Sequence, residues 1–68
     1  MKRTTKHLFA IVRVDEFQSN APWNNRITVK EIVTTEEEAR HEVERLNGLN
    51  QGKGCVYFWQ VTRLVEGT

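Results

Sequence analysis

The chain has 68 residues, of which 38% are hydrophobic and 28% charged, and its formal net charge is +1 at pH 7. This length allows a single small domain, 1–68, with a limited core, and so small a net charge excludes a partner selected by bulk electrostatics. The single cysteine, Cys55, excludes an internal disulfide and a multi-cysteine zinc site. We therefore expect a cytoplasmic globular domain with no metal, no cofactor and no membrane span.

Residues 1–6 form a basic start that we expect to be mobile, and a strand is predicted from His7 to Val14. The basic start and the apolar run 8–12 that follows it resemble a secretion signal. However, Arg13 interrupts this run and no small-residue cleavage site follows. The strand is apolar on both faces, which is typical of a strand in the middle of a sheet. One face holds Leu8, Ala10, Val12 and Val14, and the other holds Phe9, Ile11 and Arg13.

Residues 15–25 are predicted to form a long loop, because Ser19-Asn20, Pro22 and Asn24-Asn25 favour turns. A second strand is predicted over residues 26–34, where β-branched side chains dominate. Its alternation is imperfect near Lys30-Glu31, which indicates a β-bulge.

A helix is predicted to begin at Thr34 or Thr35 and to end at Asn47-Gly48. Either threonine can accept a hydrogen bond from an unpaired N–H of the first turn, and a glutamate three residues later can return the bond. The acidic run 36–38 complements the helix dipole, which explains it without an acidic recognition patch. The predicted buried stripe consists of Ala39, Val43 and Leu46.

The segment from Leu49 to Gly54 is predicted to be a glycine-rich connector, and its spacing matches no phosphate-binding loop. A third strand is predicted from Cys55 to Val65, followed by a short tail over 66–68. This strand is also apolar on both faces. One face holds Val56, Phe58 and Leu64, and the other holds Tyr57, Trp59, Val61 and Val65.

The predicted element order is ββαβ, which gives a small α+β domain with a three-stranded antiparallel sheet and one helix packed on one face. A crossover through the helix can place the third strand beside the first, giving the spatial order 2-1-3. We prefer this order because it centres the strand that is apolar on both faces. The order 1-2-3, which would bury the weaker second strand, ranks below it.

The run TTEEEARHEVERLN followed by the strand CVYFWQ resembles a type found in small, uncharacterised bacterial and phage proteins. In these proteins a strand leads into a helix that starts with Ser or Thr and Glu, and an aromatic strand closes the chain. The resemblance covers about the last two-thirds of the sequence and implies the same ββαβ fold. It implies no activity and no functional residues.

One narrow helical stripe can cover only one face of the sheet, which leaves a surplus of apolar surface on the other. Such a patch on a small protein normally marks an interaction site, where Tyr and Trp are enriched. We therefore expect a non-catalytic protein-interaction or self-associating module, a homodimer or a complex with a small protein. Edge-to-edge pairing of the third strand with its copy is another route to a dimer. The predicted interface residues are Phe9, Ile11, Trp23, Tyr57, Trp59 and Val61.

The opposing interpretation is that the long loop folds Phe17 and Trp23 back over this face and completes the core. A second functional hypothesis is single-stranded nucleic-acid binding, with Tyr57 and Trp59 as stacking platforms and Arg13 and Arg63 as cations. The near-neutral charge, the acidic helix and the lack of an RNP-like run argue against it.

A third hypothesis is an enzyme or a small-molecule binder. It would rest on Cys55, His7 and His41, with Asp15 as an orienting acid. A Cys–His pair needs spatial adjacency and a lowered thiol pKa, and the expected places of these residues give neither. His41 falls on a solvated helix face, and Cys55 is better explained as a small apolar filler. We therefore expect no catalysis.

Overall fold

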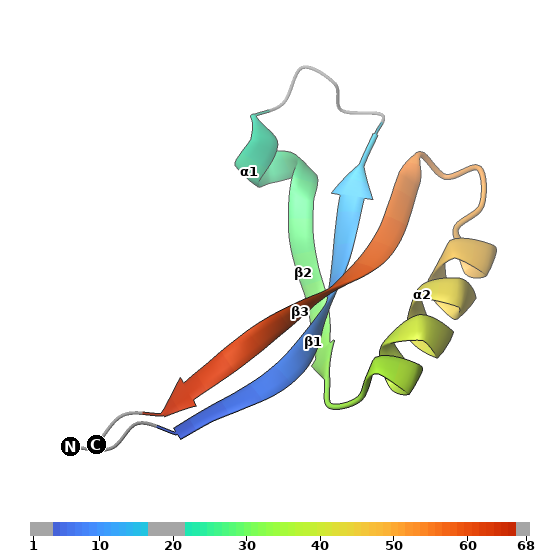
Figure 1. The fold of residues 1–68 in the computed structure, drawn as a ribbon. Coiled ribbons are helices and arrows are strands. Elements are labelled where there is room, and N and C mark those ends of the chain that lie inside the picture. The colour runs from blue at the N-terminus through green and yellow to red at the C-terminus, as the bar shows by residue number, and fades with distance from the viewer. Residues whose placement is uncertain (1–3, 17–21, 67–68) are drawn as a thin grey trace.

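The computed structural model describes residues 4–16 and 22–66, and it shows a three-stranded antiparallel sheet with a helix across one face (Figure 1). The elements are β1 (Thr4–Asp15), α1 (Trp23–Arg26), β2 (Ile27–Val33), α2 (Glu36–Leu49) and β3 (Cys55–Glu66). The strand order is β2-β1-β3. The predicted α+β fold and the order 2-1-3 are confirmed, and the alternative order 1-2-3 is wrong.

The predicted bulge is present in β2. Val29 pairs with Val12 and Glu31 pairs with Ile11, so that Lys30 is an extra residue opposite a continuous β1. The bulge shifts the side-chain alternation by one residue. Val29 and Ile32 therefore share one face of the sheet although they are three residues apart.

Of the two candidate threonines, Thr35 is the helix cap. Its Oγ1 accepts a hydrogen bond from the N–H of Glu38 at 3.1 Å and donates one to Oε1 of Glu38 at 3.0 Å. The predicted end at Asn47-Gly48 is wrong, because α2 continues through Gly48 to Leu49. The N–H and the Nδ2 of Asn50 both donate to the carbonyl of Leu46, which closes the last turn without a left-handed residue.

Two other predicted boundaries are also corrected. The loop predicted over residues 15–25 contains the short helix α1, and Arg26 ends that helix instead of opening β2. Strands β1 and β3 are longer than predicted, because they pair continuously from Thr4↔Glu66 to Asp15↔Cys55. Residues 4–6 of the predicted mobile start belong to β1, and Glu66 of the predicted tail belongs to β3. Residues 1–3 and 67–68 lie outside the described residues.

Strand β2 covers only part of β1, because its pairing stops at Phe9. Residues Thr4–Leu8 of β1 and Thr62–Glu66 of β3 therefore continue as a two-stranded ribbon beyond the end of β2. Figure 1 shows this ribbon extending away from α2. It contributes to an elongated shape, with Cα extents of 47 × 28 × 11 Å.

The core lies between the sheet and α2. Its centre is Ile11, which has no exposed surface, and it also contains Ala39, Leu46 and Tyr57. A ring of partly buried side chains packs against this centre: Phe9, Val33, Val43, Cys55 and Trp59. The predicted helical stripe is thus confirmed as the side of α2 that meets the sheet.

Candidate interaction surface

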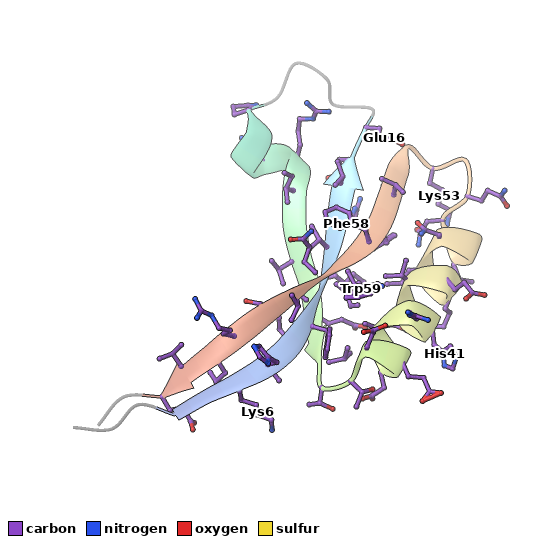
Figure 2. All side chains as sticks on the ribbon, in the orientation of Figure 1. Lys6, Glu16, His41, Lys53, Phe58 and Trp59 are labelled. Atoms are coloured by element: carbon purple, nitrogen blue, oxygen red, sulfur yellow. The ribbon has the colours of Figure 1, made fainter. Side chains whose placement is uncertain are left out.

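The helix covers the face of the sheet that was predicted to be open. Ile11 and Tyr57 are 0% and 4% exposed beneath α2, and Phe9 and Trp59 pack against them with their rings edge to face, 5.7 Å apart. Figure 2 shows Trp59 between the sheet and the helix. Of these four predicted interface residues, Ile11 and Tyr57 are thus buried in the core of the chain itself, and Phe9 and Trp59 are partly buried against it.

The remaining two predicted interface residues have different outcomes. Val61 lies on the same face of β3 as Trp59 but is 59% exposed, because it is close to the ribbon and beyond the core cluster. The side chain of Trp23 and all of residues 17–21, including Phe17, lie outside the described parts of the structure. The prediction that this loop covers the sheet is thus untested.

On the opposite face of the sheet, three cross-strand rows are apolar except for Gln60, and we call these three rows the open face. Register places Ile27, Val14 and Val56 in one row, Val29, Val12 and Phe58 in the next, and Ile32, Ala10 and Gln60 in the third. None of these nine side chains is charged. Ala10 and Val12 in the central strand are buried by their neighbours. The flanking strands contribute the exposed side chains: Ile27 40%, Val29 58%, Ile32 48%, Val56 39% and Phe58 38%.

Sequence reasoning missed this face because β1 and β3 are apolar on both sides. The enrichment of Tyr and Trp at interfaces therefore favoured the face that contains Tyr57 and Trp59. These large aromatic side chains are instead needed to fill the space beneath a helix whose own stripe is narrow. The signal that identifies the open face is in β2. Once the bulge is placed at Lys30, all three of its isoleucine and valine residues before Val33 fall on one side.

The predicted nucleic-acid site does not assemble on an accessible surface. Tyr57 is buried, and Arg13 forms an ion pair with Asp15, with Nε 2.8 Å from Oδ1. Arg63 lies on the exposed ribbon, beyond the core beneath α2. A stacking platform needs an exposed ring, so the set formed by Arg13, Tyr57, Trp59 and Arg63 does not provide one.

The candidate catalytic residues are also separated. Cys55 and Asp15 are cross-strand partners at one end of the sheet, whereas His7 is eight residues away along β1, about 26 Å in an extended strand. His41 lies on the exposed side of α2 (Figure 2). The described residues contain no group of three or more His, Cys, Asp or Glu side chains placed to hold a metal ion.

A charged cluster joins β2 to α2 on the helix side of the sheet. Arg45 donates from Nε and Nη2 to the two carboxylate oxygens of Glu42, at 2.8 and 2.7 Å. This pairing, together with a hydrogen bond from Glu31, lowers the pKa of Glu42 to about 2. The same hydrogen bond with Glu42 raises the pKa of Glu31. The bulge causes this meeting, because it directs Glu31 to the face that α2 covers.

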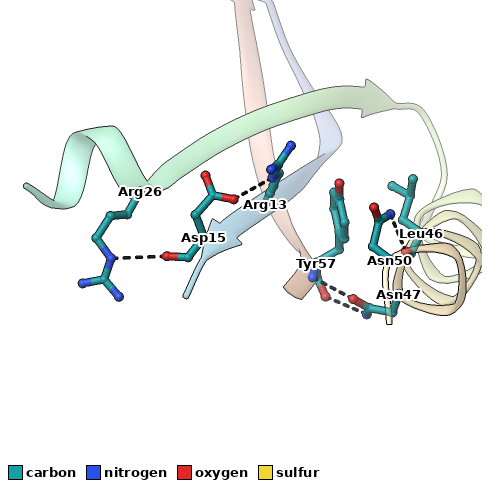
Figure 3. Close-up of polar contacts among 7 residues, drawn as sticks. All are labelled: Arg13, Asp15, Arg26, Leu46, Asn47, Asn50 and Tyr57. Carbon is teal, nitrogen blue, oxygen red and sulfur yellow. Dashed lines mark hydrogen bonds and ion pairs between the residues drawn. The ribbon is translucent and has the colours of Figure 1, made fainter. Parts of the chain in front are cut away.

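Strand β3 is an edge strand, and one position on its outer edge is closed by α2. The N–H of Tyr57 donates to Oδ1 of Asn47 at 2.8 Å, and Nδ2 of Asn47 donates to the carbonyl of Tyr57 at 3.0 Å (Figure 3). The amide of Asn47 thus takes the place of a neighbouring strand. Closing an edge in this way is a means of preventing unwanted strand pairing.

No protein-family model matches the chain, and no curated protein or solved structure shows significant similarity to it. The resemblance to small bacterial and phage proteins therefore stays a prediction. No helix among the described residues is long and apolar enough to cross a membrane.

Proposed function

We propose that the protein is a non-catalytic interaction module that self-associates through its open face. The observation that supports this proposal is the set of five large apolar side chains, each 38–58% exposed, in three cross-strand rows that contain no charged residue. Contiguous apolar patches of this kind normally mark interaction sites. Two copies stacked face to face would form a β-sandwich with its inner faces about 10 Å apart.

The total surface of the chain supports the same proposal. Its accessible surface is 5284 Å² for a mass of 8.0 kDa, whereas a compact monomer of that mass exposes about 4,450 Å². The chain therefore exposes roughly 800 Å² more than a compact monomer, and both the open face and the ribbon contribute to this excess. The radius of gyration is 14.4 Å, against about 11 Å for a compact domain of this length. Pairing would give the thin sheet a second apolar layer.

A second copy is the partner that this surface favours. The three uncharged rows offer no electrostatic means of selecting a different protein, and two copies of these rows meet without repulsion. Small domains also gain core by pairing, and most soluble oligomers are symmetric homomers. The lone thiol of Cys55 supports a reducing cytoplasmic setting for this module.

The test is sedimentation velocity of the wild type and two lysine variants over about 1–100 μM, the range in which modest interfaces dissociate. Val29→Lys places a charge on the open face, and Leu49→Lys is the matched control at the end of α2. Val29 and Leu49 are 58% and 60% exposed, so the two changes differ in location and not in exposure. We expect the wild type and Leu49→Lys to dimerise and Val29→Lys to remain monomeric. A wild type that is monomeric over the whole range would contradict the proposal.

A further inference from the structure

The outer edge of β3 is open over Val61–Val65, beyond the position that Asn47 closes. Successive residues of a strand point their backbone groups to alternate sides. The groups of Tyr57 point away from β1, because Asn47 binds them, and the pairing of β3 with β1 is regular along its whole length. The N–H and carbonyl groups of Val61, Arg63 and Val65 therefore also point outward.

This open segment has the properties of a site for strand addition. None of the described residues forms a hydrogen bond with the outward-facing backbone groups of these three residues. The segment contains neither a proline nor a bulge, two of the devices that blunt an exposed edge, and its one charged side chain is that of Arg63. Every side chain from Val61 to Glu66 is exposed, and so none of the described elements covers the segment.

Two basic residues beside this edge have no acidic partner among the described residues. His7 and Arg63 are direct cross-strand neighbours, and the outward direction of the Arg63 backbone makes them a non-hydrogen-bonded pair, with side chains close together. Neither forms an ion pair with any residue in ranges 4–16 and 22–66. Together with Val61 and Thr62 they line an open hollow. The other charged side chains of the ribbon, Lys6 and Glu66, belong to its opposite face.

We propose that Val61–Val65 binds an extended peptide segment of a partner protein as a fourth strand, with an acidic side chain of the peptide opposite Arg63. Main-chain hydrogen bonds along such an edge supply affinity, and pockets for alternate side chains supply specificity. In the bound peptide, the residue two places before the acidic residue and the residue two places after it lie opposite Val61 and Val65. Both of these peptide residues are apolar. The recognised pattern is apolar-x-acidic-x-apolar. This site uses the edge of the sheet and goes beyond the proposed function, which uses the open face.

Fluorescence anisotropy of a labelled peptide with blocked ends, Thr-Val-Thr-Glu-Thr-Val-Thr, tests the charge requirement. We expect saturable binding, and about tenfold weaker binding when lysine replaces the glutamate, because a partly exposed ion pair becomes a repulsive pair. The variant Arg63→Glu should reverse this preference and select the lysine peptide. Absence of saturable binding, or an unchanged preference in Arg63→Glu, would overturn the proposal.

A proline variant tests the backbone requirement. The N–H of Val61 points outward, so Val61→Pro removes a donor from the free edge and none from the pairing with β1. We expect Val61→Pro to keep the circular dichroism spectrum of the wild type and to lose peptide binding, while Val61→Ala keeps most of it. If Val61→Pro instead abolishes self-association, the edge is occupied by a second copy and the proposal is wrong. The open-face variant Val29→Lys should bind the peptide normally, which separates this test from that of the proposed function.

Discussion

Asn47 of α2 and Tyr57 of β3 are joined by two hydrogen bonds in which a side-chain amide satisfies both backbone groups of one strand residue. The pair joins the last turns of the helix to the edge of the sheet, close to the start of β3. Because Tyr57 is also one of the buried residues of the core, the same pair fixes where its ring enters the space beneath α2.

Asn47→Ala is expected to destabilise the protein by about 1–2 kcal/mol, since it leaves two partly buried backbone groups without partners. Urea denaturation measures the effect. Glu44→Ala, an exposed change on the same helix, is the control for helix propensity and should cost little. Asn47→Asp keeps the acceptor for the N–H of Tyr57 but loses the donor, and it should fall between the two. Equal stability of Asn47→Ala and Glu44→Ala would show that the pair contributes nothing.

The same substitution at two glycines should have opposite effects. Gly48 lies inside α2, and a Cβ added there would meet nothing within 4 Å, so Gly48→Ala is expected to stabilise by about 0.5–1 kcal/mol. The φ angle of Gly52 is +78°, a value at which any residue with a Cβ is strained. Gly52→Ala is therefore expected to destabilise by about 1–2 kcal/mol. Thermal unfolding followed by circular dichroism gives both signs. A loss of stability in Gly48→Ala would mean that α2 ends earlier than Leu49.

The stability contributed by the Glu42–Arg45 pair should depend on pH. The folded-state pKa of Glu42, about 2, lies below the usual value of 4.5, so the contribution is complete above pH 4.5 and is lost as the pH falls towards 2. The raised pKa of Glu31 acts in the opposite sense, since its contribution is present at low pH and is lost as the pH rises through the folded-state value.

The measurement is the difference in urea midpoint between the wild type and Arg45→Gln from pH 7 to pH 2. We expect the wild type to be the more stable at pH 7 and the difference to disappear across the window from 4.5 to 2. Arg40→Gln removes the exposed pair that Arg40 forms with Glu36 at 2.6 Å, and as the control it should show only a small difference. A difference for Arg45→Gln that is independent of pH would contradict the assignment.

The sequence was sufficient to predict the three strands, the helix α2 and the strand order, but not the short helix α1. Thr35, the imperfect alternation near Lys30 and the two apolar faces of β1 each carry a local signal. The side of the sheet that α2 covers could not be predicted. It depends on which residues of β1 form backbone hydrogen bonds with β2 and which with β3. The apolar residues on both faces of β1 are compatible with either arrangement. The exposed edge of β3 required knowledge of the contact between Asn47 and Tyr57, which are ten residues apart.

Lys30 is the one residue of β2 that a regular pairing with β1 does not need. Loss of its three nucleotides would leave Val29 opposite Val12 and Glu31 opposite Ile11, and would restore a two-residue period to β2. Ile27, Val29 and Ile32 would then alternate with Thr28 and Glu31 and would all keep their direction. An in-frame deletion of this exposed lysine would therefore straighten the strand and keep the apolar surface on the same face of the sheet.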